Sequence, residues 1–380
     1  MHVVDEVIDL ARTLLAFNTL NPPGDEALCM TFLADFLKSR GFQVKLHTFA
    51  ERRYNLVAHF AGKRKEGKPL VFTGHLDTVP LGDAPWHHDP FGGEIADGKL
   101  YGRGASDMKA AVAAFIIACQ QRRSDIETGP GITLLLTSGE ETGCDGARAL
   151  IAQSAIDLPT AGALIVGEPT ANYPVIGHKG ALWLRCETQG KTAHGAMPEL
   201  GVNAIYLAAD AIGKIRLFDP GAPHPLMKKP TLNVGVIHGG LNINSVPDRS
   251  YFDVDIRSAP NLRHSEIRQR LSAALGDRVA MTTLVDLPAV LTDTDNQWIK
   301  AVFARCQPLH DAPLQARVVP YFTDASLLIP ALGAPPCIIL GPGEPNQAHQ
   351  TDEYCEVDKL CRSVDLYGEL IGDWSARNRR

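Results

Sequence analysis

Short apolar stretches alternate with segments of helical periodicity in the first half of the chain, and this alternation constrains the fold more than any other feature. The apolar stretches lie at about 54–60, 69–74, 131–138 and 162–167. The helical segments lie at about 3–17, 26–40 and 108–121. Such an alternation predicts an α/β fold, in which helices pack on the faces of a mixed sheet. In these sheets reactive side chains gather where the strands end at their carboxyl edge.

The pattern changes after Gly177. The stretch SYFDVDIRSA alternates apolar and polar residues, as a strand with one solvated face does. With two helical stripes and three further strands it predicts the order β-α-β-β-α-β of a ferredoxin-like α+β sandwich. From about residue 295 the earlier pattern returns. We therefore predict a first domain in two parts, 1–177 and 288–380, with a second domain, 178–287, inserted between them.

Composition limits the class of protein. The chain has 380 residues, more than the roughly 250 to 300 that one hydrophobic core usually holds. Its net charge of −6 and the lack of a long basic run argue against nucleic acid as a partner. No apolar stretch is long enough to span a membrane, and the first residues form an amphipathic pattern rather than a leader peptide. The eight cysteines are isolated and several lie in apolar runs, so we expect reduced core thiols rather than disulfides or metal ligands, and a cytoplasmic location.

Histidine and carboxylate side chains follow the predicted strands. These residues are His75, Asp77, Asp107, Glu140, Glu141, Glu168 and His349. Each alone has an ordinary explanation. GHLDTVP suits a polar strand edge, Asp107 a helix N-cap, and Glu168, before a proline, a turn. The paired glutamates suit a solvated surface and His349 an exposed loop. Because these residues recur at one edge of a sheet instead of being scattered, we predict a shared metal site.

Two histidines and three carboxylates are a donor set typical of zinc, with manganese or cobalt as alternatives. Charge counting favours two ions, because three carboxylates offset three of four positive charges and a bridging hydroxide offsets the fourth. Of the seven candidate residues, Asp77 and Glu140 are then left without a role as metal ligands. Asp77, two residues from His75, is placed to accept the other ring N–H of that histidine and fix its tautomer. Glu140 is placed to take a proton from the bridging water.

A series of motifs resembles a known family, the co-catalytic zinc acylases and exopeptidases that include acetylornithine deacetylase, succinyl-diaminopimelate desuccinylase, aminoacylase and carboxypeptidase G. The resemblance extends over essentially the whole chain. The motifs are FNTLNPP, GHLDTVP, DPFGGEIADGKLYGRGASDMKA, SGEETG, GEPT, KTAHGAMPELGVNAI, GGLNINSVPD and AHQTDEY. The resemblance implies a zinc-peptidase core, here the catalytic domain, with an inserted lid and dimerisation domain, and it implies a homodimer.

The resemblance also implies a role for each candidate residue at the metal site. One zinc ion is expected on His75, Asp107 and Glu168, and the other on Asp107, Glu141 and His349. Asp107 would then bridge the two ions. Asp77 orients His75, and Glu140 is the general base and acid. In the family a cis peptide often follows the bridging aspartate, which here would join it to Met108.

Four further residues are implied in substrate contacts. On sequence alone His194 reads as a loop histidine and Arg257 as a solvated strand residue. In the family the histidine that matches His194 stabilises the oxyanion, often from the partner subunit. Arg257, near Asn244, would hold the substrate carboxylate with its planar guanidinium. Thr323 resembles a threonine that contacts the substrate.

We therefore expect a hydrolase that cleaves the amide bond of an N-acyl amino acid through a hydroxide bridging two metals, with Glu140 as base. The stretch EPNQAHQTDEY is most similar to acetylornithine deacetylase, which would place the protein in arginine biosynthesis. A glutamate at position 168, where an aspartate is the alternative, is more similar to the family's deacylases and carboxypeptidases than to its aminopeptidases and dipeptidases. The alternatives are succinyl-diaminopimelate desuccinylase, which needs a further cation, and a dipeptidase or carboxypeptidase of the same family. A metal-binding relative without turnover is disfavoured, because the base and all five ligands are present.

Overall fold

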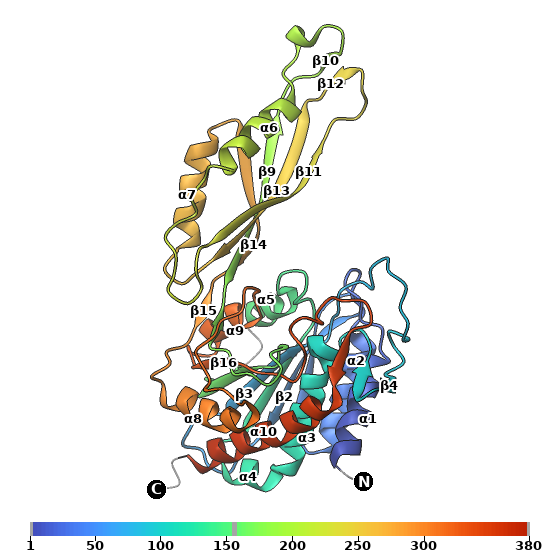
Figure 1. The fold of residues 1–380 in the computed structure, drawn as a ribbon, viewed down its shortest axis with the longest axis vertical. Coiled ribbons are helices and arrows are strands. Elements are labelled where there is room, and N and C mark those ends of the chain that lie inside the picture. The colour runs from blue at the N-terminus through green and yellow to red at the C-terminus, as the bar shows by residue number, and fades with distance from the viewer. Residues whose placement is uncertain (1–2, 154–157, 378–380) are drawn as a thin grey trace. The chain divides into compact units, whose positions relative to one another are not determined.

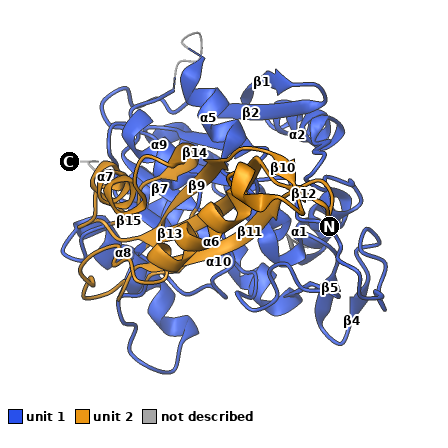
Figure 2. Ribbon diagram, turned by 90° about the horizontal axis from the view of Figure 1, so that it is seen from above, with its two compact units in different colours: residues 1–177, 292–317, 323–380 blue, residues 178–291, 318–322 orange. Residues whose placement is uncertain are grey.

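The computed structural model describes residues 3–153 and 158–377, and the chain divides into two compact units (Figure 2). Unit 1 comprises residues 1–177, 292–317 and 323–380, and unit 2 comprises residues 178–291 and 318–322. Unit 2 thus begins where the predicted insertion begins. It continues four residues beyond the predicted end, to Leu291, and it includes a short second segment that the sequence pattern did not indicate.

Unit 1 is built around a six-stranded mixed sheet (Figure 1). In spatial order the strands are β1 (Gln43–Ala50), β2 (Arg53–Phe60), β6 (Ile132–Thr137), β3 (Leu70–His75), β7 (Ala163–Val166) and β16 (Cys337–Ile339). β6, β3, β7 and β16 are parallel to one another, and β2 is antiparallel to β6. Every residue of β3, β6 and β7 is buried, as expected for strands covered on both faces. The predicted α/β fold is confirmed.

Helices flank this sheet. They are α1 (Val3–Leu15), α2 (Ala27–Ser39), α3 (Ala110–Gln121), α4 (Arg123–Thr128), α5 (Asp145–Ala152), α8 (Gln297–Cys306), α9 (Ala325–Ala331) and α10 (Val357–Ala376). α3 is apolar on all sides, which suits its position between β3, α1 and α10. Phe115 of α3 stacks on Phe72 of β3, with ring centroids 4.2 Å apart. An irregular turn, residues 105–109, leads into α3.

Unit 1 also has a second, three-stranded sheet, which contacts the 105–109 turn. Its order is β17 (Tyr354–Glu356), β5 (Lys99–Tyr101) and β4 (Ile95–Ala96). β17 also contacts the 105–109 turn. This small sheet therefore joins the segment before α3 to the segment before α10.

Unit 2 contains a four-stranded antiparallel sheet in the spatial order β11-β13-β9-β14. Its elements in chain order are β9 (Gly180–Gln189), α6 (Ala204–Ile215), β11 (Thr231–Gly239), β13 (Arg249–Ser258), α7 (His264–Leu275) and β14 (Val279–Leu287). The chain order and the pairing are those of the predicted ferredoxin-like sandwich. Phe252 and Val254 of β13 pack in one cluster with Leu271 of α7. The helices therefore cover one face of the sheet.

Short strands complete unit 2. The chain enters the unit at β8 (Gly177–His178) and leaves its main segment after β15 (Val290–Leu291). β10 (Ala193–His194) pairs with β12 (Ser245–Val246) in a separate two-stranded ribbon. Because β10 follows β9 and β12 precedes β13, the ribbon extends from the Arg249 end of the sheet.

Two expectations from composition were also tested by the fold. Seven of the eight cysteines are buried, which agrees with their prediction as core residues. Within residues 3–153 and 158–377, no helix combines the length and the apolar character that crossing a membrane requires.

Candidate metal centre

Four adjacent parallel strands of unit 1, β6, β3, β7 and β16, end at one edge of its sheet. His75 is the last residue of β3, Glu141 follows β6, and Glu168 lies two residues after β7. β16 leads into the loop that contains His349, and Asp107 belongs to the turn before α3. Because parallel strands present their carboxyl ends on one side, side chains from five distant parts of the chain converge there.

Asp107 lies between the two histidines. Its Oδ1 is 3.1 Å from His75 Nε2, and its Oδ2 is 3.6 Å from His349 Nε2. His349 Nε2 is also 3.1 Å from Glu141 Oε2, and His75 Nε2 is 3.7 Å from Glu168 Oε1. Candidate ligand atoms of His75, Asp107 and Glu141 all lie within 4.8 Å of one another. The five predicted ligands are thus brought together as two overlapping groups that share Asp107.

This set of side chains fits a divalent metal. Glu141 Oε1 is buried and has no hydrogen-bond partner among the described residues. A buried carboxylate oxygen without a donor is costly unless a cation satisfies it. Imidazole nitrogens with carboxylate oxygens suit zinc, manganese or cobalt better than calcium or magnesium. The peptide bond after Asp107 is cis, as the resemblance implied.

Without a cation, the histidines and carboxylates of the cluster shift one another's pKa values. Hydrogen bonds to Asp107 and Glu141 raise the pKa of His349 to about 10. Burial acts to lower the pKa of His75, but Asp107 and Glu168 raise it well above its usual value. Burial raises the pKa of Glu168, and the charge of Asp107 acts in the same direction. Protons therefore occupy this cluster at neutral pH when no metal is bound.

Asp77 is fully buried and contacts His75, but not in the predicted way. His75 Nδ1 is 2.9 Å from the backbone oxygen of Asp77 and 3.6 Å from its carboxylate. The carboxylate instead accepts hydrogen bonds from the backbone N–H groups of Glu140 and Glu141, each at 3.2 Å, and from Asn21 Nδ2 at 2.9 Å. The Asp77 carboxylate therefore positions the turn of the two glutamates, while its backbone orients the histidine.

Glu140 is buried, and the charges of several candidate ligands act on it. Burial raises the pKa of Glu140 well above its usual value. The charges of Glu168, Glu141 and Asp324 raise this pKa further, and His75 opposes them. A carboxylate in this environment is suited to both taking and giving a proton near neutral pH.

Three of the predicted site residues belong to unit 2. His194 and Asn244 lie together there, whereas Arg257 lies elsewhere in the unit. His194 pairs with Ser245 in the β10–β12 ribbon, next to Asn244. Arg257 is eight residues from Arg249 on β13, so at about 3.3 Å per residue it lies roughly 26 Å from the ribbon end of that strand. The expected proximity of Arg257 and Asn244 within one chain is therefore wrong, because one long strand separates them.

Arg257 is half-buried among aromatic side chains. Its Nε is 2.9 Å from Asp255 Oδ1, and its guanidinium carbon lies 5.4 Å from the ring centroid of Phe322 and 5.9 Å from that of Trp183. Trp183 Nε1 donates to the same aspartate. The guanidinium is thus held in one orientation by charge and by ring contacts.

Thr323 is fully buried. Its hydroxyl oxygen accepts a hydrogen bond from the backbone N–H of Ala325, at the start of α9. This contact gives the side chain a structural role at the helix end, and its predicted contact with substrate stays a prediction.

Two buried residues near the cluster were missed as functional candidates. Asn21 bonds to the Asp77 carboxylate, and Glu353 accepts four hydrogen bonds around the turn of Asp107. Both lie in motifs quoted above, FNTLNPP and AHQTDEY. The sequence could have indicated both residues, because each is a polar residue inside a motif and neither had been assigned as a ligand.

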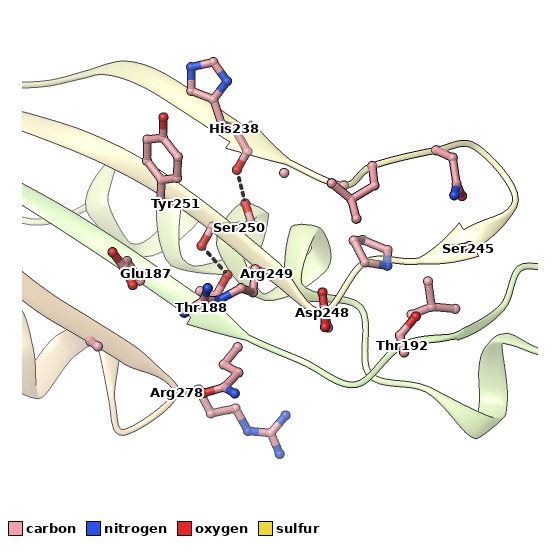
Figure 3. A pocket seen from close by; sticks show the side chains of 18 of the residues that line it. Glu187, Thr188, Thr192, His238, Ser245, Asp248, Arg249, Ser250, Tyr251 and Arg278 are labelled. Atoms are coloured by element: carbon pink, nitrogen blue, oxygen red, sulfur yellow. Dashed lines mark hydrogen bonds between the residues drawn. The ribbon is translucent and has the colours of Figure 1, made fainter.

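A cavity of about 780 Å³ lies in unit 2, beside the β10–β12 end of its sheet (Figure 3). Its charged lining residues are Glu187, Asp248, Arg249, Asp277 and Arg278. Ser250 donates a hydrogen bond to the backbone oxygen of His238, and Thr188 donates one to that of Ser250. None of the predicted site residues lines this cavity, and its nearly balanced charges favour no class of ligand.

Comparisons with known proteins agree with the fold. The model of Peptidase family M20/M25/M40 matches residues 71–373. A family M20 metallo-carboxypeptidase from Sulfolobus solfataricus has a TM-score of 0.80 at 18% identity, covering 98% of this chain and 99% of that chain. A tripeptidase from Staphylococcus aureus has a TM-score of 0.74 at 22% identity, with the same coverage. A Bacillus subtilis protein, described as a dinuclear metal binding peptidase from the M20 family, has a TM-score of 0.67 at 14% identity, covering 98% of each chain.

Proposed function

Because the chain belongs to peptidase family M20/M25/M40, we propose that it is a metal-dependent hydrolase that cleaves the amide bond of an N-acyl amino acid of the acetylornithine type. The observation that carries this proposal is the position of Asp107, which directs one carboxylate oxygen towards each of two histidines. A carboxylate shared in this way suits a centre of two metal ions, and such centres serve in hydrolysis.

The proposed cofactor is two zinc ions per chain, with cobalt or manganese as substitutes. Their ligands are His75, Asp107 and Glu168 for one ion, and Asp107, Glu141 and His349 for the other. When bound, the ions supply Lewis-acid chemistry that polarises the scissile carbonyl and lowers the pKa of the attacking water.

Glu140 performs the proton transfers in this proposal. Its carboxylate takes a proton from the attacking water and later gives it to the departing amine. The burial of Glu140 and its position in the chain next to the proposed ligand Glu141 support this role as a proton carrier.

In this proposal Arg257 and Asn244 bind the free carboxylate of the substrate, and His194 stabilises the oxyanion. Asp255 and two aromatic rings hold the guanidinium of Arg257 in place, which supports directed binding of a planar carboxylate. The length of β13 between Arg257 and the ribbon of His194 supports a site completed by a second copy of the chain.

A homodimer through unit 2 follows from the same proposal. β11 lies at the edge of its sheet, and a free strand edge is a template for pairing with another chain. Large exposed apolar side chains gather on β11, at the start of α6 and near the β10–β12 ribbon. They are Met197, Leu200, Val202, Tyr206, Val236, Ile237, Leu241 and Ile243. An exposed apolar group of this size marks a protein interface.

A peptide substrate is the second candidate, since the solved structures of similar fold include a tripeptidase and a metallo-carboxypeptidase. The deciding experiment measures amine release from N-acetyl, N-succinyl and N-formyl amino acids and from dipeptides, using zinc-loaded protein. We expect turnover of N-acetylornithine that stops with a chelator and returns with zinc. Turnover of a dipeptide while N-acetylornithine stays inert would overturn the proposed substrate.

A further inference from the structure

The carboxylate of Glu353 is fully buried and accepts four hydrogen bonds. Its Oε1 accepts from the backbone N–H groups of Ser106 and Asp107, at 2.8 and 3.0 Å. Its Oε2 accepts from the backbone N–H of Gly104 and from Arg103 Nη1, at 2.9 and 2.8 Å. Four donors on one ionised group form a strong cradle, because charged acceptors make the shorter and stronger hydrogen bonds.

All four donors belong to one segment, residues 103–107, which ends at the shared ligand Asp107. Arg103 is itself buried and donates a second hydrogen bond to the backbone oxygen of Pro80. Glu353 therefore fixes the backbone that carries Asp107, whereas its four donors include no residue of β3, which ends at His75, or of the segment from β7 to Glu168.

Glu353 also belongs to the loop of the other histidine, four residues after His349. That loop is fastened to the same segment at further points. Ser106 Oγ donates to the backbone oxygen of Tyr354 at 2.6 Å and accepts from the backbone N–H of Glu344 at 2.8 Å. His349 adopts a φ of 66°, which is uncommon for a residue other than glycine, so the fastening of this loop helps to hold it there.

We propose that Glu353 is a positioning residue that sets the separation between Asp107 and His349 and so forms the second metal position. This inference rests on the proposed two-metal function. A glutamine at this position would keep one acceptor oxygen and turn an NH₂ group towards backbone donors. Asp107 and His349 would then lose their common anchor, whereas the position that Asp107 shares with His75 and Glu168 would keep these two ligands, which lie in other segments of the chain.

The test is a titration of metal-free protein with zinc by calorimetry and with cobalt by visible absorption, which both report binding without turnover. We expect two binding steps in the parent protein. In Glu353→Gln the weaker step should lose about 10- to 100-fold in affinity, as is typical when a group that supports a metal ligand is removed, while the first step changes by less than about threefold. Glu353→Asp, which keeps the charge, should recover part of the loss.

Glu26→Gln is the matched control, since Glu26 is also fully buried and bonds to an arginine, Arg53, yet it hydrogen-bonds to no described residue of either loop. It should lose thermal stability and keep both binding steps. Equal affinities in Glu353→Gln and the parent would overturn the inference. If Glu353→Gln does not fold, Ser106→Ala decides: a weakened second step supports the inference and an unchanged one overturns it. Fewer than two steps in the parent would instead contradict the proposed function.

Discussion

Glu140 and Glu141 are adjacent in the chain but have different surroundings. Glu141 Oε2 lies 3.1 Å from His349, in the group that shares Asp107. We expect Glu140→Gln to retain two zinc ions and to lose about 10²- to 10⁴-fold in kcat, because an amide cannot carry the proton. Glu141→Gln, its neighbour control, should lose bound metal as well. Metal analysis and kcat measured on both variants check this, and near-parental kcat in Glu140→Gln would show that another group is the base.

The pKa of His349 makes metal binding depend on pH. Its ordinary value of 6.5 is raised to about 10 in the metal-free fold. Since the folded pKa is the higher one, protonation of His349 stabilises the metal-free fold fully below pH 6.5, and this stabilisation disappears as the pH rises towards 10. Zinc must displace the same proton.

We therefore expect zinc to raise the melting temperature more at about pH 8.5 than at about pH 6. Thermal unfolding with chelator or with zinc, at both pH values, measures the difference. His349→Asn should reduce it, because that variant has no proton to displace at this position. An equal rise at both pH values in the parent protein would contradict the assignment of His349 as a ligand.

At the scale of elements, the turn between β6 and α5 depends on Asp77, because its carboxylate accepts hydrogen bonds from the backbone N–H groups of Glu140 and Glu141. Asp77→Asn weakens these two hydrogen bonds. We expect kcat to fall about 10- to 100-fold, with a smaller loss of zinc affinity, as for other groups that support a metal site. Thr142→Val is a control in the same turn, because Thr142 bonds to Asn21 and Asp145 instead. Steady-state kinetics and zinc calorimetry should separate the two variants.

The elements that position the site were predictable, because each has a strong local pattern. The apolar stretches at β3, β6 and β7 are buried on every residue, and a candidate ligand lies at the end of each strand or within four residues after it. β1 was missed, since its alternating burial and edge position leave polar residues along it. The contacts of Asp77 were only partly predictable, because an H-x-D spacing does not distinguish a carboxylate acceptor from a backbone one. Glu353 was missed because its four donors are about 250 residues away in the chain and no local pattern records such a contact.

At the scale of the molecule, the candidate site residues are divided between two units. The candidate ligands and Glu140 belong to unit 1, and His194 and Arg257 to unit 2. The prediction that Arg257 and Asn244 meet failed within one chain, although the rise per residue of a strand already sets their separation once β13 is recognised. Family resemblance implies roles for these residues, but for this chain it leaves open whether His194 acts in its own copy or in the partner's.

Mixing two inactive variants tests whether each chain of the proposed dimer contributes His194 to the site of its partner. If His194 completes the site of the partner, a dimer of Glu140→Gln with His194→Ala has one site that contains both intact side chains and one that contains neither. Random exchange of equal amounts makes half of the dimers mixed, so activity should recover to about a quarter of the parental value in a twofold-symmetric dimer. The variants are exchanged under mild denaturant, and amide hydrolysis is compared with that of each variant alone. Activity that stays at the level of the separate variants, while mixed dimers are detected by mass, would place His194 in the site of its own chain.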